Sequence, residues 1–247
     1  MNMSIFIIED YLNGLSQFAE CINISNKGIT YLPDLSRFTN LKILYCSHNK
    51  LTSLSLLNPN LEELYCSYNK LTSLPKLNPN LKILCCHHNL LTILPPLTEK
   101  IEKLYCYNNK LTSLPPLNIS LNELWCSYNQ LTNLPSLNIN LEELFCSYNS
   151  LTSFPNLNPK LKKCCCHLNP IYDIIYNSNM TILRYNIETL NRFKELFYCL
   201  KYKAKFRYLL WFKLREPKIQ KKYHPTNLAI LLNENDNIDL CKILNEW

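Results

Sequence analysis

Residues 61–80 read LEELYCSYNKLTSLPKLNPN, and this 20-residue pattern is written seven times in the chain. The copies begin at Leu41, Leu61, Leu81, Ile101, Leu121, Leu141 and Leu161. Apolar residues return at positions 1, 4, 6, 11, 14 and 17 of each copy, and a proline usually follows position 14. Self-similarity at a short fixed period predicts a solenoid, in which each copy forms one coil that buries its apolar edge against the next.

The order of residues within one copy predicts the path of a coil. Around Leu64, Tyr65 and Cys66 the side chains alternate as in a short strand, so Leu64 and Cys66 point inward while Tyr65 points outward. Pro75 then favours an extended return segment, because proline breaks a helix. We therefore predict parallel strands on the concave face and extended, polyproline-like segments on the convex side.

Two residue types occupy one position in every copy. Cysteine holds the sixth position, at Cys46, Cys66, Cys86, Cys106, Cys126, Cys146 and Cys166. Asparagine holds the ninth, at Asn49, Asn69, Asn89, Asn109, Asn129, Asn149 and Asn169. Ladder cysteines lie side by side about 4.8 Å apart, which disfavours disulfides and predicts buried free thiols. The asparagines are predicted to turn the chain and to bond backbone groups that no strand pairing satisfies.

The repeated motif L-x-x-L-x-C-x-x-N-x-L-T-x-L-P-x-L resembles the leucine-rich repeat superfamily, in its shortest, 20-residue class. Bacterial effectors of the LPX type carry this class, and so do uncharacterised repeat proteins of bacteria and giant DNA viruses. The resemblance covers residues 19–174 and implies a leucine-rich repeat solenoid. It does not extend to the ubiquitin-ligase domain of LPX-type effectors, because Cys199 and Cys241 lack the C-x-D motif of that domain.

The repeats divide the chain into three parts. Residues 1–18 are predicted to form a short cap, since the open end of a solenoid needs a cover. The solenoid is predicted over residues 19–174 as about eight repeats: 19–40, 41–60, 61–80, 81–100, 101–120, 121–140, 141–160 and 161–174. Residues 175–247 are predicted to form a basic, α-helical C-terminal cap or tail.

The C-terminal tail carries the excess positive charge of a chain whose formal net charge is +7. Residues 184–222 contain twelve Lys or Arg against three Glu. Apolar spacing predicts helical structure over 187–212, with shorter helices over 224–232 and from 236 to the C-terminus. Two interpretations stay open: the tail caps the last coil through its aromatic residues, or it binds nucleic acid or an anionic membrane surface.

Aromatic residues recur at outward positions of the predicted strands, and we expect them to bind a protein partner. The fifth position supplies Tyr45, Tyr65, Tyr105, Trp125 and Phe145, and the eighth supplies His48, Tyr68, His88, Tyr128 and Tyr148. Stacking between neighbouring strands is the alternative role for these rings. The third position mixes Glu, Lys and Ile, which disfavours a nucleic-acid site on this face.

No metal site, cofactor, small-molecule substrate or catalytic activity is expected. The runs at residues 85–88 and 164–167 hold Cys and His, but adjacent residues of a strand face opposite sides and cannot join one metal ion. Cys85 and Cys165 are expected to point outward and to react readily with thiol reagents. The substitution Asn118→Ala, on the convex side, is expected to have almost no effect on partner binding.

The expected setting is the cytoplasm, or the host cytoplasm if the protein is viral. The chain contains 13 cysteines, and free thiols indicate a reducing compartment. The apolar run at residues 5–8 is too short for a signal peptide, and no stretch is long enough to span a membrane. The three N-x-S/T sequons are then accidents of an asparagine-rich chain.

Overall fold

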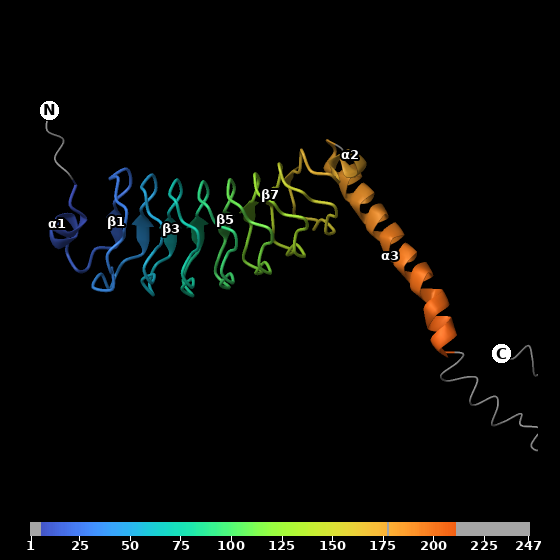
Figure 1. Ribbon diagram of the computed structural model, residues 1–247, viewed down its shortest axis with the longest axis horizontal. Coiled ribbons are helices and arrows are strands. Elements are labelled where there is room, and N and C mark those ends of the chain that lie inside the picture. Colours follow the sequence, from blue (N-terminus) through green and yellow to red (C-terminus); the bar gives the residue numbers. More distant parts are fainter. Residues whose placement is uncertain (1–5, 177, 211–247) are drawn as a thin grey trace, which may run out of the picture. The chain divides into compact units, whose positions relative to one another are not determined.

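The computed structural model describes residues 6–176 and 178–210, and it confirms the predicted solenoid of parallel strands (Figure 1). Its strands form one sheet in sequence order: β1 (Cys21–Asn23), β2 (Ile43–Tyr45), β3 (Glu63–Tyr65), β4 (Ile83–Cys85), β5 (Lys103–Tyr105), β6 (Glu123–Trp125), β7 (Glu143–Phe145) and β8 (Lys163–Cys165). Its helices are α1 (Ile8–Asn13), α2 (Tyr172–Ile175) and α3 (Met180–Leu210). The chain divides into two compact units, residues 1–191 and 192–247.

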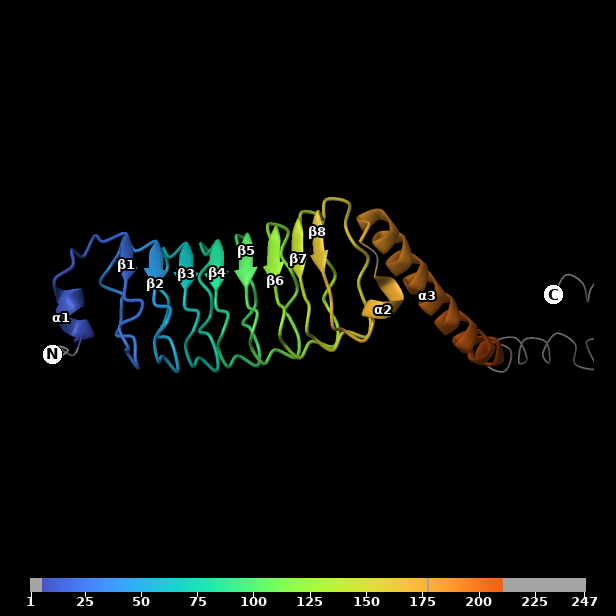
Figure 2. The same ribbon diagram turned by 90° about the horizontal axis from the view of Figure 1, so that it is seen from above.

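Each strand pairs with the next in parallel, and the register keeps equivalent positions of the repeat side by side (Figure 2). Leu64 pairs with Leu44 on one side and with Leu84 on the other. Between β1 and β8, all of which the structure describes, the return segments contain no helix. This agrees with the helix-breaking prolines of the convex side.

The core runs as continuous columns through the coils. In the coil of residues 61–80, Leu61, Leu64, Cys66 and Leu71 are buried almost completely. Every cysteine of the sixth position is at most 2% exposed. A small side chain is suited to this position, because it packs between the leucines of its own coil and those of the neighbouring coils.

The asparagine at position 9 joins its own coil to the preceding one. Asn89 Nδ2 donates to the carbonyl oxygens of Cys66 at 3.0 Å and Cys86 at 3.1 Å. Its Oδ1 accepts from the Leu71 N–H at 3.0 Å. One side chain thus satisfies backbone groups of two coils, which no strand pairing reaches.

The residue before each of these asparagines adopts a left-handed backbone, one position earlier than the sequence predicts the turn. The residues are His48, Tyr68, His88, Asn108, Tyr128, Tyr148 and Leu168, with φ between 52° and 55°. In the first repeat Asn26, which precedes Lys27, adopts the same conformation with φ 58°. Asparagine tolerates this conformation, whereas a tyrosine or leucine pays a steric cost of about 1 kcal/mol. The hydrogen bonds of the adjacent asparagine hold the chain there despite that cost.

A second asparagine ladder lies on the return side, at position 18. Its members are Asn58, Asn78, Asn118, Asn138 and Asn158. Asn118 Nδ2 donates to the Thr98 carbonyl oxygen at 2.5 Å, and its Oδ1 accepts from the backbone N–H of Ser120 and Leu121, each at 2.9 Å. Asn118→Ala should therefore lower stability, because this side chain also joins two coils, and its small effect on partner binding stays a prediction.

The N-terminal end of the solenoid is covered by α1. Ile8 and Leu12 project from this helix into the core and are each 3% exposed. Asn13 accepts a hydrogen bond from Arg37 at 3.0 Å, and Tyr31 donates one to Glu9. These contacts close the apolar end of the first coil.

The C-terminal end is covered by the beginning of α3. Leu183 and Ile187 are buried, at 2% and 1% exposure, and join the core of the solenoid. Arg184 donates to the carbonyl oxygens of residues 158, 159 and 161, at distances between 2.9 and 3.3 Å. Asn191 donates to the Phe154 carbonyl oxygen at 3.0 Å.

The first turns of α3 supply these contacts with aliphatic and polar side chains. The aromatic residues of the predicted cap, from Phe193 onward, belong to the second compact unit, so capping through them stays a prediction. Arg184 is one of the twelve basic residues of 184–222, yet its guanidinium binds backbone carbonyls. Residues 211–222 and the helices predicted over 224–232 and from 236 onward lie outside the described residues.

Candidate protein-binding surface

Ion pairs between neighbouring coils neutralise the charges at positions 2 and 3. The pairs are Lys42–Glu20 (3.1 Å), Lys82–Glu62 (2.6 Å), Lys103–Glu123 (2.7 Å), Lys162–Glu142 (2.6 Å) and Lys163–Glu143 (2.6 Å). Each joins residues one coil apart. Most of the Lys and Glu residues at these positions are therefore paired with each other, and this side of the strands carries little net charge.

The aromatic residues of position 5 are half-buried and contact one another along the sheet. The Tyr45 and Tyr65 rings stack with centroids 4.7 Å apart. Trp125 contacts Tyr105 at 4.8 Å and Phe145 at 5.1 Å. The structure thus brings all five predicted rings onto one column, in two groups that Cys85 separates.

The aromatic residues of position 8 form two stacks. Tyr68 lies between His48 and His88, with centroid distances of 4.2 and 4.1 Å and interplanar angles of 11°. Tyr128 and Tyr148 stack at 4.1 Å with the same angle. Asn108 Nδ2 meets His88 Nδ1 at 2.9 Å, in place of a further ring. The tyrosines of this column are 41–51% exposed, so they present their edges to solvent.

Position 7 adds two rings that the sequence analysis does not include. His87 and Tyr107 stack at 4.2 Å with an interplanar angle of 9°, and Tyr107 lies 6.4 Å from Trp125. The sequence shows Ser at this position in four copies, so the signal lies in the three copies that depart from it, at His87, Tyr107 and His167. Because His87 also contacts Tyr68 at 5.3 Å, these two rings join the stack of His48, Tyr68 and His88 to Trp125 in one aromatic surface. The pairs Tyr45–Tyr65 and Tyr128–Tyr148 extend the same two columns.

Protonation of His87 is opposed by its position within this surface. Burial, followed by the nearby His88 and His48, lowers the pKa of His87 from 6.5 to about 4. Burial also lowers the pKa of His88. Both rings are therefore neutral at pH 7, and the folded protein takes up these protons less readily than the unfolded chain.

Acid is expected to destabilise the protein through His87. The pKa of His87 is lower in the folded state than in the unfolded chain. The free energy of unfolding is therefore highest above pH 6.5 and decreases as the pH falls toward 4. We expect a loss of about 1–2 kcal/mol, since the half-buried ring is partly solvated. Urea unfolding of wild type and His87→Phe at both pH values checks this. The variant keeps a ring against Tyr107 and should lose less stability; equal losses would contradict the assignment.

One cysteine that the sequence predicts to be exposed and reactive is buried in the structure. Cys85 was expected to point outward and react readily, but it is 7% exposed, and burial raises its pKa to about 12. It lies between Tyr65 and Tyr105 on the neighbouring strands, whose larger side chains cover it. Cys165 is half-buried, and burial raises its pKa. The sequence analysis does not single out Cys21, which is exposed at the first strand.

Among the cysteines whose side chains the structure describes, Cys21 is expected to react first in thiol labelling of the folded protein. The ladder cysteines and Cys85 should react slowly, since reaction requires an accessible thiolate and burial raises the pKa of Cys66, Cys85 and Cys106. Peptide mapping after a short exposure to iodoacetamide measures the order, with Cys21→Ser as the control. Rapid modification of Cys106 in folded protein would show that the inward register is wrong.

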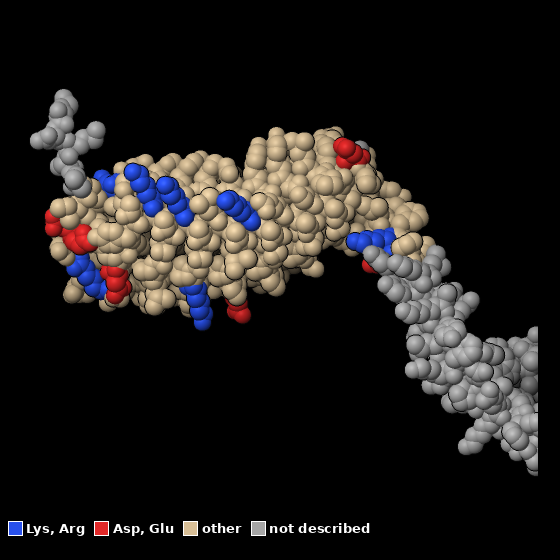
Figure 3. All heavy atoms as spheres, viewed as in Figure 1, with Lys and Arg blue, Asp and Glu red and all other residues tan. Residues whose placement is uncertain are grey.

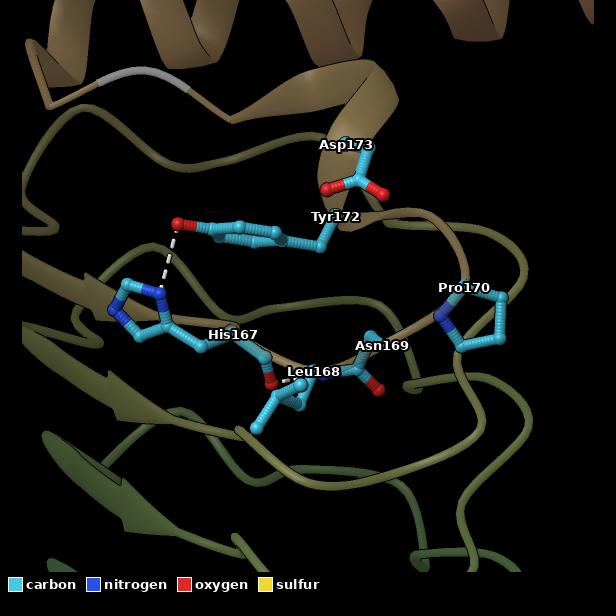
Figure 4. A pocket seen from close by; sticks show the side chains of 6 residues that line it. All are labelled: His167, Leu168, Asn169, Pro170, Tyr172 and Asp173. Atoms are coloured by element: carbon cyan, nitrogen blue, oxygen red, sulfur yellow. Dashed lines mark hydrogen bonds between the residues drawn. The ribbon is translucent and has the colours of Figure 1, made fainter.

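A hollow of about 620 Å³ lies where the last coil meets α2, lined by His167, Leu168, Asn169, Pro170, Tyr172 and Asp173 (Figure 4). His167 Nδ1 and the Tyr172 hydroxyl are 2.8 Å apart. This hydrogen bond links the solenoid to its C-terminal cover. Among the described residues, no three His, Cys, Asp or Glu side chains are grouped to hold a metal ion. No helix in the described ranges is long and apolar enough to cross a membrane.

The parallel one-coil register, the asparagine ladder and the repeat length define the class of protein: the chain belongs to the leucine-rich repeat family. The family model described as Leucine Rich repeats (2 copies) matches residues 59–99. A comparison with curated proteins gave no match.

Among solved structures, the chain is similar to YopM from Yersinia enterocolitica WA-314, with 35% identity and a TM-score of 0.61 over 63% of this chain and 34% of YopM. It is similar to the LRR domain of a Shigella effector, with 31% identity and a TM-score of 0.57 over 66% of this chain and 73% of that domain. The functional domain of InlJ from Listeria monocytogenes, which includes a cysteine ladder, shows 29% identity and a TM-score of 0.51 over 67% of this chain and 42% of InlJ.

The chain spans 34% and 42% of the two YopM structures, from Y. enterocolitica and Y. pestis. It is a leucine-rich repeat protein similar to bacterial effectors, a class whose repeats generally serve as interaction modules. The similarity to proteins of giant DNA viruses stays a prediction.

Proposed function

We propose that this protein is a non-enzymatic module that binds a protein partner through the aromatic surface of its strands, in a reducing cytoplasm. The observation that carries the proposal is the joining of the rings at positions 5, 7 and 8 into one half-exposed surface. Aromatic side chains of this kind are enriched in the cores of protein interfaces, because they bury large areas at a low cost in conformational entropy.

The ion pairs of positions 2 and 3 favour aromatic contacts as the source of affinity. Lys103 and Lys163 already pair with Glu123 and Glu143 of adjacent coils. A partner that displaced these pairs would gain little, since exposed ion pairs contribute only about 0.2–1 kcal/mol each. The rings form no ion pairs, although the hydroxyls of Tyr65 and Tyr105 donate hydrogen bonds to Glu63 and Glu123.

Trp125 lies at the centre of the surface. It contacts Tyr105, Phe145 and Tyr107, the nearest rings of coils on both sides. Its Nε1 is buried and has no hydrogen-bond partner among the described residues. An unsatisfied buried donor costs the folded state about 1–3 kcal/mol.

The test is the substitution Trp125→Ala. It should weaken partner binding by about 2 kcal/mol or more, roughly 30-fold, because central aromatic residues contribute most to interface affinity. Ile139→Ala, which removes an exposed apolar side chain outside the strands of the same coil, is the control. Proteins captured from the native cells by wild type and by Ile139→Ala but not by Trp125→Ala are the partner candidates, whose affinities are then measured with purified proteins. Equal affinity of the three forms would refute the proposal.

A further inference from the structure

The charges of the repeats are divided between the two ends of the strands. The acidic residues of the regular coils lie at positions 2 and 3, before or at the start of each strand, and at Glu99. Lysines at the same positions pair with several of them, as in Lys82–Glu62 and Lys162–Glu142. That end of the strands is therefore close to neutral.

The opposite end of the strands carries lysines and no acid. The segments 47–58, 67–78, 87–98, 107–118, 127–138 and 147–158, which follow the strands, contain no Asp or Glu. At position 10 they place Lys50, Lys70 and Lys110, all exposed. None of the three forms an ion pair within the described part of the chain. We call Lys50, Lys70 and Lys110 the basic edge; Figure 3 shows a row of basic side chains over the coils from β1 to β5.

In the stack of His48, Tyr68 and His88, the first two rings lie two residues before Lys50 and Lys70, and His88 lies two residues before Leu90. Its ring faces are 4.1–4.2 Å apart and cover one another. Single-stranded nucleic acid gains affinity by stacking bases on free aromatic faces, which this stack does not offer. The ring edges carry N–H and O–H groups instead, and these donate to carboxylates.

We propose that the basic edge binds an acidic segment of the protein partner, which lies across coils 41–120 with carboxylates on Lys50, Lys70 and Lys110. The inference rests on the proposed function, because it assigns a chemistry to that partner. Coils repeat every 4.8 Å or so, close to the 5.4 Å rise of one helical turn. A helix that faces each coil with one residue per turn therefore matches this spacing better than an extended strand does, with acidic residues on Lys50, Lys70 and Lys110 and an apolar residue on Leu90.

The experiment uses a fluorescein-labelled helical peptide of about 16 residues with Glu on one face, and the same peptide with Gln in place of Glu. Fluorescence anisotropy with the full chain should show binding of the Glu peptide only. The triple variant Lys50→Gln, Lys70→Gln, Lys110→Gln should weaken it about tenfold or more. Lys42→Gln, Lys82→Gln, Lys162→Gln removes the same charge from the paired end and is the matched control.

The outcomes separate this inference from the proposed function. Equal weakening by both triple variants would overturn it, since that result would reflect net charge alone. Tighter binding of an oligodeoxythymidine than of the Glu peptide, lost in the same Lys50, Lys70 and Lys110 variant, would also overturn it in favour of nucleic acid. If the peptide does not bind but partner capture still depends on Trp125, the inference fails and the proposed function stands.

Discussion

Replacing Asn89 by alanine is expected to lower the free energy of unfolding by about 3 kcal/mol or more, a large part of the 5–15 kcal/mol typical of a folded domain. The side chain is 6% exposed and bonds the carbonyl oxygens of Cys66 and Cys86 and the N–H of Leu71. Alanine leaves the Leu71 N–H buried without a partner and removes one of the two asparagine donors of each carbonyl, since Asn69 still bonds the Cys66 oxygen and Asn109 the Cys86 oxygen. Urea denaturation followed by circular dichroism measures the change.

Asn89→Asp tests the direction of these hydrogen bonds. Aspartate keeps an acceptor for the Leu71 N–H, but it places a carboxylate oxygen against two carbonyl oxygens. It should therefore destabilise the protein at least as much as alanine, because the buried charge lacks a counter-ion. Asn133→Ala, at an exposed position of the return side, is the matched control and should stay within about 0.5 kcal/mol of wild type. Similar urea midpoints for Asn89→Ala and Asn133→Ala would show that the ladder does not stabilise the coils.

The repeat spacing predicts most of the fold because each coil must bury the same edge in the same way. Leu64 and Cys66 face inward in the structure as alternation requires, and a period of one coil forces every strand into parallel register. The hydrogen bonds of the asparagine ladder at position 9 could also be predicted from the sequence, since a polar residue repeated beside a strand end needs backbone partners.

The features that sequence reasoning missed depend on what neighbouring coils place beside a residue. Cys85 faces outward as expected but is covered, because Tyr65 and Tyr105 flank it on both sides. Asn118 recurs at position 18, yet its partner is a carbonyl one coil earlier, and no local pattern shows which carbonyls lack donors. His87 joins the aromatic surface only because Tyr107 lies on the next coil.

The end of the second asparagine ladder explains the contacts of Arg184. Within the ladder, Asn158 Nδ2 donates to the carbonyl oxygens of Asn138 and Leu141, one coil earlier. The residue one coil after Asn158 is Ser178, so the equivalent carbonyls of Asn158 and Leu161 have no asparagine to bond. Arg184 takes that place from α3, with Nε 3.3 Å from the Asn158 oxygen and Nη2 2.9 Å from the Leu161 oxygen.

Arg184→Ala is expected to lower the free energy of unfolding by about 3 kcal/mol, because charge-assisted hydrogen bonds to the last coil are lost and its carbonyls stay buried. Arg184→Lys should recover little, since one ammonium group cannot reach carbonyls that the planar guanidinium fork spans. Lys194→Ala removes the same charge at an exposed site of the same helix and should change stability by no more than about 0.5 kcal/mol. If Arg184→Ala and Lys194→Ala unfold at the same urea concentration, Arg184 does not stabilise the packing of α3 on the last coil. That result would leave the positive charge at the start of α3 available to an anionic ligand. Under the capping role, Arg184→Ala should also expose apolar surface at the last coil, measured as increased binding of a hydrophobic dye before the main unfolding transition.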